Sequence, residues 1–392
     1  MSGFNLRIAL WLLLSLLPSG RSVCLAQVDP YPRSLLEFGY DQSVFDQGPQ
    51  TLYAYYHYNN PALGSTNMAL RLVAAPVYFD GELGLRNVLP HTDLGLGLNG
   101  GGFGENYYEL RQGRYLKEES FDGHGGGASL SIYHLINPGQ LIPLNLIAHG
   151  GVHYSTYSAT DRTDDRFRLP RDRVSTFTRL GVRLAGKEPM LYEALGMEVS
   201  VWYEHQWRLD DTAYGFAGDR NVEPSTALYW LYAGMSYAWT NSGQQVAFAL
   251  TAGGTENADR FSAWRLGGVL PLSAEYPITL PGYYYQELSA QSFVHFSAEY
   301  VIPLSHDHRW KLRLSAASAY VEYLPGLEEG NHWQTGTGPS LSFSSRSGVW
   351  QTILRYGYGV DAIRDGHTGA HSVGLLYQYN FEARKQRRAA AK

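Results

Sequence analysis

Through most of this chain, apolar and polar residues alternate one by one, which is the two-residue period of a β-strand with one apolar and one polar face. Residues 292–304 show the pattern clearly, because one face carries Val294, Phe296, Ala298, Tyr300 and Ile302. The alternating segments are about 10 residues long, enough for a tilted strand to cross a bilayer. Strands of soluble sandwiches are shorter, about 5 or 6 residues. The pattern therefore predicts membrane-spanning strands.

The alternation predicts sixteen strands, an even number as in bacterial barrels. They are expected near 34–43, 50–59, 67–76, 79–88, 92–100, 126–136, 144–157, 173–185, 191–207, 226–240, 244–253, 288–304, 308–322, 337–346, 349–360 and 370–381. Short turns alternate with long connections at 101–125, 158–172, 208–225, 254–287, 323–336 and 361–369. Short periplasmic turns opposite long outer loops are typical of outer-membrane barrels and place both termini in the periplasm. The expected fold is an all-β transmembrane antiparallel β-barrel; a large aromatic sandwich is the alternative.

Composition agrees with this prediction. Only 17% of the 392 residues are charged, below the roughly 25% of soluble domains. The net charge of -5 and the lack of a basic stripe before the C-terminus argue against a nucleic-acid partner. Aromatic residues gather toward strand ends, for example in 53–58 and 201–207, as in the aromatic girdles at the two membrane interfaces.

The N-terminus predicts a signal peptide over residues 1–26. Arg7 precedes an apolar run from Ile8 to Leu17, which is shorter than the about 20 residues of a spanning helix. Cleavage after Ala26 would remove Cys24, the single cysteine. Residues 27–381 then form the barrel, and 382–392 are expected to be a basic periplasmic tail too short to fold. The expected location is the outer membrane of a Gram-negative-type bacterium.

Motifs of enzyme chemistry lack their required context. The G-x-G-x-x-G at 95–100 lies on an alternating strand with no helix behind it, and the HGGG at 124–127, interpreted as a loop re-entering a strand, has no G-x-S-x-G partner. His149 and His153 share a strand face but lie about 13 Å apart, too far to chelate one ion. We therefore expect no catalytic residue, metal ligand or cofactor, and no enzyme.

Several charged residues fall on the face opposite the apolar one. A charge facing lipid at mid-depth costs about 2–4 kcal/mol, so these side chains are expected in the lumen. They are Glu299, Lys311, Arg313, Arg179 and Arg355. Either they form a solvated, salt-bridged lumen, or they help to hold a loop inside the barrel.

The stretch TLPGYYYQEL (279–288) lies in the long connection 254–287. Pro281-Gly282 is a turn signal, yet three tyrosines, Tyr283 to Tyr285, follow it. We expect these tyrosines to pack against the inner wall of the barrel, with their hydroxyls hydrogen-bonded to polar lumen groups.

The order of RFSAWRLGG (260–268), LPGYYY, SAEYVIPL (297–304), LRLSAASAYVEY (312–323), VWQTILRYGYG (349–359) and HSVGLLYQYNF (371–381) resembles the C-terminal barrel of the BamA/TamA family, also called the bacterial surface antigen family. The resemblance covers about residues 244–381. It implies a sixteen-stranded outer-membrane barrel that inserts or translocates proteins. It also implies a sixth outer loop folded into the lumen, with a Phe-x-x-Gly-Gly-like element at Phe261 to Gly267 and Gly268. The family's loop tip carries an Arg that pairs with acidic groups on the inner wall.

This chain departs from that pattern at three places. Pro281 stands where the family has Arg, before Gly282 and Tyr283, so Glu299 is expected to pair with Arg313 or Arg265 instead. No periplasmic repeats precede the barrel, and a basic tail follows it. The last strand keeps a terminal pattern similar to the signal recognised when barrels are assembled, at Gly374, Tyr377, Tyr379 and Phe381.

Two functions are compatible with these features. The first is insertion or translocation of proteins through a seam between the first strand (34–43) and the last (370–381), weakened by Gly39 and Gly374. Its expected partners are outer-membrane lipids, client outer-membrane proteins and a separate periplasmic protein. The second is a passive or plugged pore, or a structural membrane protein, without assembly activity.

Overall fold

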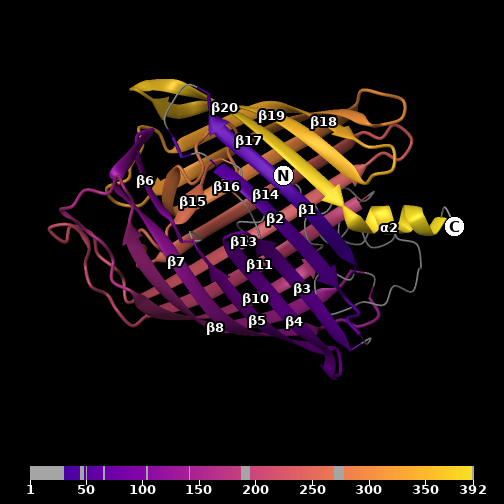
Figure 1. The fold of residues 1–392 in the computed structure, drawn as a ribbon, viewed down its shortest axis with the longest axis horizontal. Coiled ribbons are helices and arrows are strands. Elements are labelled where there is room, and N and C mark those ends of the chain that lie inside the picture. The colour runs from indigo at the N-terminus through magenta and orange to yellow at the C-terminus, as the bar shows by residue number, and fades with distance from the viewer. Residues whose placement is uncertain are drawn as a thin grey trace, which may run out of the picture.

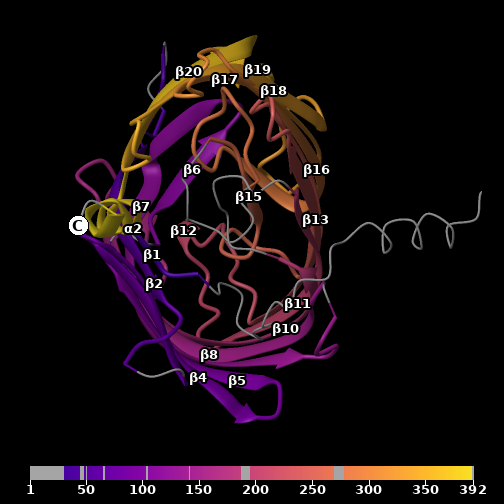
Figure 2. The same ribbon diagram turned by 90° about the vertical axis from the view of Figure 1, so that its right-hand side faces the viewer.

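The computed structural model describes residues 31–44, 48–49, 51–64, 67–102, 105–140, 142–186, 195–268 and 278–390. Sixteen antiparallel strands form a closed barrel (Figures 1 and 2), which confirms the predicted fold. Each strand pairs with its neighbour in the wall, and the first pairs with the last to close the ring.

The wall strands are β1 (Arg33–Ser43), β2 (Thr51–Asn60), β3 (Met68–Ala75), β4 (Tyr78–Leu89), β5 (Thr92–Gly101), β7 (Arg114–Leu135), β8 (Leu144–Ala159), β10 (Arg173–Ala185), β11 (Leu195–Arg208), β13 (Ser225–Ala238), β14 (Gln245–Glu256), β16 (Leu288–Pro303), β17 (Trp310–Tyr323), β18 (Trp333–Ser344), β19 (Trp350–Arg364) and β20 (His367–Asn380). Four short strands lie in the long connections: β6 (Tyr107–Arg111), β9 (Phe167–Arg168), β12 (Gly215–Phe216) and β15 (Trp264–Leu266). All sixteen predicted strands are found; residues 191–194 of one of them, and the predicted signal peptide, lie outside the described residues.

The outer face of the wall is apolar, and the alternation on β16 shows why. Val294 and Phe296 are each 49% exposed on the outside, whereas Phe293 and His295, on the inside, are 2% exposed. Large exposed apolar side chains continue around the ring, a pattern that is stable only against lipid. No helix in the described part of the chain is long and apolar enough to cross a membrane.

The predicted loop 101–125 is more regular than expected. It contains β6 and the first half of β7, which pair as a hairpin that continues past the end of β5. Residues 124–127 therefore lie within β7 and are not a loop, because the run of small residues lets β5, β7 and β8 keep their pairing there.

The C-terminal tail also differs from its prediction, since α2 (Phe381–Ala390) follows β20 directly. The side chain of Asn380 accepts a hydrogen bond from the Ala383 N–H at 3.0 Å, which caps the helix. Glu382 in the first turn and Arg387 and Arg388 in the last turn interact favourably with the helix dipole and stabilise the helix. Helix α2 extends beyond the short-turn end of the barrel (Figure 1). The tail is thus able to fold.

Several of the long connections enter the lumen. Figure 2 shows the wall strands as a ring, with β12 and β15 inside its outline. The largest buried apolar cluster joins the connection between β14 and β16, through Leu266, Leu280 and Tyr283, to wall residues such as Phe293 and Val321. The barrel therefore has a packed interior at this level.

A substitution at the centre of β16 tests which face meets lipid. Phe296→Arg should destabilise the folded barrel by about 2–4 kcal/mol, because it places a charge in the bilayer. Ser297→Arg, the next residue on the lumen face, should cost much less. Guanidinium unfolding in lipid vesicles measures both, and equal losses would contradict the orientation.

Candidate functional site: a loop held inside the barrel

The connection 257–287, here called the lumen loop, returns along itself inside the barrel. Its first arm contains β15, which pairs with the start of β16. The second arm joins the first through backbone hydrogen bonds, from the Leu280 N–H to the Gly267 carbonyl at 2.7 Å and from the Gly268 N–H to the Tyr284 carbonyl at 2.7 Å. His295 on the wall donates from Nε2 to the Thr279 carbonyl at 3.0 Å. The loop is therefore an ordered part of the interior over its described residues.

The Gly267-Gly268 pair permits this return. A Cβ on Gly267 would overlap the Tyr284 carbonyl oxygen, and one on Gly268 would lie 2.7 Å from the Tyr283 carbonyl oxygen. Gly267 also has φ +148°, in the region that favours glycine. Close approach of two backbone segments thus explains why two glycines stand here.

The tip of the loop is a turn at Leu280-Pro281-Gly282-Tyr283. The Tyr283 N–H donates to the Leu280 carbonyl at 3.3 Å, and Gly282 has φ +90°. Proline followed by a glycine with positive φ is the sequence of a type II turn. Pro281 therefore shapes the tip.

Glycines on the wall receive this tip. A Cβ on Gly336 of β18 would overlap the Pro281 carbonyl oxygen, and a Cβ on Gly357 of β19 would overlap the Gly282 nitrogen. A Cβ on Gly282 itself would overlap the backbone nitrogen of Gly359. The tip therefore packs backbone against backbone on β18 and β19.

The tyrosines after the turn are held by both packing and hydrogen bonds. Tyr283 is 1% and Tyr284 4% exposed, whereas Tyr285 is half-buried. The Tyr283 hydroxyl donates to Gln334 Oε1 at 2.7 Å, and Gln334 Nε2 donates to the Tyr323 hydroxyl at 2.8 Å. The hydroxyls of Tyr283 and Tyr323 thus both find a partner in Gln334, as buried tyrosines require.

A buried ion pair fastens the second arm to the wall. Arg364, at the outer end of β19, contacts both carboxylate oxygens of Glu287, at 2.5 and 2.8 Å. The Arg364 guanidinium also lies 3.6 Å from the centre of the Tyr284 ring, and Glu287 accepts the Tyr284 N–H at 2.7 Å. The two charged side chains are 6% and 2% exposed, so this bidentate pair is shielded from water.

Sequence reasoning missed this pair. The predicted strand ended at residue 360, and Arg364 was placed in the loop 361–369, whereas β19 runs four residues further. The family resemblance implied a loop cation paired with an acid on the wall. Here the loop supplies the acid, Glu287, and the wall supplies the cation.

The two charges expected to hold the loop, Glu299 and Arg313, lie on β16 and β17. They pair with each other, with 3.2 Å between Arg313 Nε and Glu299 Oε1. The other cation considered, Arg265, donates to the Ser289 hydroxyl at 2.6 Å. Glu299 therefore takes the first of its two expected partners.

Phe261 lies apart from the tip, in a cap formed by the outer connections. It packs in an aromatic cluster with Tyr107, Phe121, Phe167 and Tyr214. The predicted latch residues are thus divided between two places: the turn and the glycine pair lie together in the lumen, and Phe261 belongs to the cap.

The same outer cap contains a charged cluster around Glu109, beyond the membrane-spanning part of the wall. Arg260 lies 3.2 Å and Arg220 3.5 Å from Glu109 Oε1, and Arg220 also pairs with Glu119. Burial alone would raise the pKa of Glu109, but Arg220 and Arg260 more than offset it and lower the pKa to about 2. Glu109 stays ionised and joins the cap to the first arm of the lumen loop.

The residues of the expected terminal signal occupy the end of the last strand. Gly374, Tyr377 and Tyr379 lie on β20, and Phe381 is the first residue of α2. The Tyr379 and Phe381 rings are 4.8 Å apart, and Tyr377 stacks on Trp350 at 6.3 Å. In the described residues, no group of three His, Cys, Asp or Glu side chains could hold a metal ion.

No family model and no curated protein matches this chain. Solved structures do match. CdiB from Acinetobacter baumannii is 12% identical with a TM-score of 0.61, over 89% of this chain and 60% of that one. CdiB from Escherichia coli is 14% identical with a TM-score of 0.55, over 88% and 63%. BamA from Haemophilus ducreyi lacking POTRA domains 1-3 is 10% identical with a TM-score of 0.53, over 88% and 70%.

These matches establish the fold, a barrel like those of BamA and CdiB. The protein is thus a transmembrane β-barrel. It spans less than two thirds of the length of the CdiB chains.

Gly282→Ala should release the tip of the lumen loop. The added methyl group would overlap the β19 backbone, and the positive φ adds strain. We expect a loss of stability well above 1 kcal/mol, measured by guanidinium unfolding, together with a larger single-channel conductance. Gly326→Ala is the matched control, because its φ of +83° is similar but its Cβ would meet nothing within 4 Å. Equal effects of the two would contradict the proposed packing.

Arg364→Met should destabilise the barrel by about 3–5 kcal/mol, because it leaves the Glu287 carboxylate buried without its cation. The double variant R364M/E287M removes both charges and should recover most of that loss. A double-mutant cycle from unfolding midpoints measures the coupling. Additive losses would show that the ion pair does not hold the loop.

Proposed function

We propose that this protein inserts or translocates proteins at the outer membrane through the junction between β1 and β20. This junction, here called the seam, carries the proposal. It is the place in the wall where two adjacent strands are not joined by a loop, so they can separate without any other junction opening. Pairing along the seam runs from Leu35↔Asn380 to Ser43↔Ser372. This pairing is shorter than that of β7 and β8, from Phe121↔Ala159 to Leu135↔Asn145, but longer than that of β2 and β3, from Tyr56↔Ala74 to Asn60↔Leu70.

The lumen face of the seam carries two glycines, and the Tyr53 ring of β2 covers one of them, Gly39. Gly39 lies opposite Leu376, and Gly374 lies opposite Asp41, whose carboxylate occupies the space where a Cβ on Gly374 would be. Gln378 donates one hydrogen bond across the seam to Glu37, at 3.2 Å. Two more side-chain contacts supplement the backbone pairing: Ser43 donates to the His371 carbonyl at 3.3 Å, and on the outer face the Phe38 and Tyr377 rings lie 6.5 Å apart.

The seam can open in lipid only if the backbone groups of β1 and β20 find new hydrogen-bond partners. Separated strands expose N–H and C=O groups, which the hydrocarbon core cannot satisfy. A client strand that adds to the free edge would restore those hydrogen bonds, as in β-augmentation. In this mechanism the arriving client strand stabilises the open form, and the barrel closes again when the client leaves.

The lumen loop would connect this movement to the interior. Tyr284 contacts two parts of the wall region: Arg364 at the outer end of β19, and Gly48 in the connection after β1. Movement of β1 would thus shift a neighbour of the loop. A separate periplasmic protein would deliver clients, and the aromatic end of β20 would act as the signal for assembly of the barrel itself.

A plugged pore or structural protein is the second candidate. The observation that favours it is the packing of the loop tip on β18 and β19, which places the loop inside the lumen. Such a protein needs no movement of β1, so the two candidates differ in what a fixed seam would do.

A disulfide across the seam separates them. Tyr40 and Leu375 are directly paired, and in antiparallel sheets paired Cα atoms lie about 4.5–5.5 Å apart, within the range of a disulfide. In a Cys24→Ser background, oxidised Y40C/L375C should lose the ability to accelerate folding of a client barrel in liposomes, and reduction should restore it. L180C/Y203C, a paired position between β10 and β11, is the control and should keep full activity.

Two results would contradict the proposal. Oxidised Y40C/L375C that still accelerates client folding would exclude the seam as the route. Wild-type protein that conducts ions but never accelerates folding would favour the plugged pore.

A further inference from the structure

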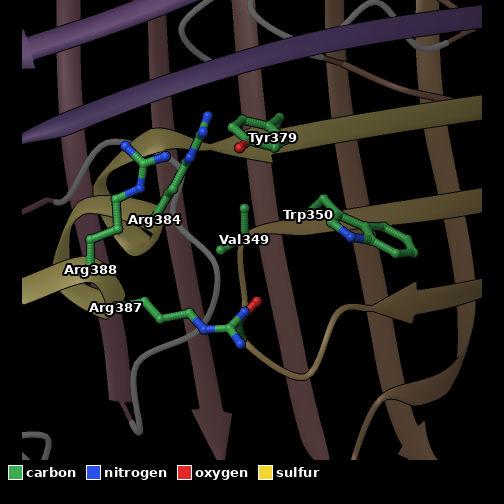
Figure 3. Close-up of a pocket in the computed structure, with 7 residues that line it drawn as sticks. Val349, Trp350, Tyr379, Arg384, Arg387 and Arg388 are labelled. Carbon is green, nitrogen blue, oxygen red and sulfur yellow. The ribbon is translucent and has the colours of Figure 1, made fainter. Parts of the chain in front are cut away.

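Helix α2 presents three arginines on one side. Arg384, Arg387 and Arg388 follow the i, i+3 and i+4 spacing of a helix face. Together with residues of the turn between β18 and β19 and the end of β20, they line a pocket of about 530 Å³ at the short-turn end of the barrel. In Figure 3, Arg384 extends toward Tyr379, and Arg387 extends below Val349.

Among the described residues, this pocket is lined by three cations and by no acid. Its lining consists of the three arginines, Ser347, Val349, Trp350 and Tyr379. The one acid of the helix, Glu382, pairs with Lys385 at 2.6 Å. Within the described part of the chain, no salt bridge involves the three arginines. Their exposed guanidinium groups are available to bind an anion.

The position of the pocket indicates where that anion resides. Trp350 lies 5.4 Å from the Phe343 ring, and Phe343 lies 4.6 Å from Trp310, so aromatic side chains gather at the short-turn ends of β17 to β20. Such belts mark the level of the lipid headgroups. The three arginines come directly after this belt in the sequence, on the helix that continues β20 toward the periplasmic side.

We propose that this pocket binds the headgroup of an anionic phospholipid of the periplasmic leaflet. Guanidinium groups bind phosphate oxygens in pairs, which suits a cluster of three arginines. The Trp350 and Tyr379 rings and the Val349 side chain provide an apolar side for the glycerol and the first methylene groups. Free phosphate would use only the charged half of the pocket, which is why the lipid is the better fit.

Bound lipid would join two parts of the barrel end. The arginines extend from the helix that continues β20, whereas Val349 and Trp350 belong to the turn before β19 and to β19 itself. The headgroup would therefore fix the end of the strand that forms one side of the seam. This inference does not depend on whether the protein acts on clients.

Native mass spectrometry of the full chain in zwitterionic detergent tests the proposal. Dioleoyl phosphatidylglycerol is titrated against wild type and against R384Q/R387Q/R388Q. Each basic residue near an anionic lipid surface contributes about 1 kcal/mol, so we expect the triple variant to bind roughly 100-fold more weakly. The control R162Q/R166Q/R171Q removes the same charge from the exposed connection between β8 and β10, and it should bind like wild type.

Two further titrations identify the source of the phosphate. Dioleoyl phosphatidylcholine should bind more weakly than phosphatidylglycerol, and millimolar inorganic phosphate should not displace bound phosphatidylglycerol. Displacement by inorganic phosphate would overturn the lipid assignment. Binding of phosphatidylglycerol to R384Q/R387Q/R388Q that equals wild type would overturn the site itself.

Discussion

The structure depends on one constraint, which is that backbone groups inside a membrane must hydrogen-bond to other backbone groups. Sixteen strands meet this requirement only because β1 and β20 close the ring. Closure lets the outer face be apolar and the inner face polar, and this division produces the alternation along the chain. The same hydrogen bonds between β1 and β20 therefore hold the wall together and would have to break in the proposed opening of the seam.

The interior adds a second level of organisation. Beyond the β15–β16 pairing and the His295 hydrogen bond, the lumen loop contacts the wall by backbone packing of its tip on glycines and by the Glu287–Arg364 pair of its second arm. The packing of the tip depends on the close fit of two backbones and involves no charge. The ion pair adds an electrostatic attraction in a place shielded from water. In the BamA/TamA family, which the sequence resembles, the loop carries the cation and the wall the acid; here the two charges are exchanged between loop and wall.

The fold was predictable from the sequence because period-two alternation is a direct result of a wall with lipid on one side. Three parts of the structure were not predictable because they do not lie in a wall with lipid on one side. The hairpin of β6 and β7 rises beyond the bilayer, so its residues do not alternate. Strand β19 continues to Arg364, beyond the segment in which apolar and polar residues alternate, so the alternation did not place Arg364 on the wall. Helix α2 depends on a cap from Asn380 and on local charges, which are weak signals in a basic tail of eleven residues.

The turn at the loop tip was visible as Pro-Gly before three tyrosines, but the glycines that receive it were not. Gly336, Gly357 and Gly359 look like ordinary small wall residues until the loop is placed against them. Their role is set by a contact between distant segments, and no local pattern carries that information.

The closing junction also determines the order in which the barrel can form. Glu37 and Gln378, which meet across it, are 341 residues apart in the chain, whereas Glu287 and Arg364 are 77 apart. Contacts between distant residues form slowly, because a long loop must be closed before they contribute any stability. The shorter chain separation therefore favours placement of the lumen loop against β18 and β19 before the ring closes, so that the wall is completed around an interior already partly built.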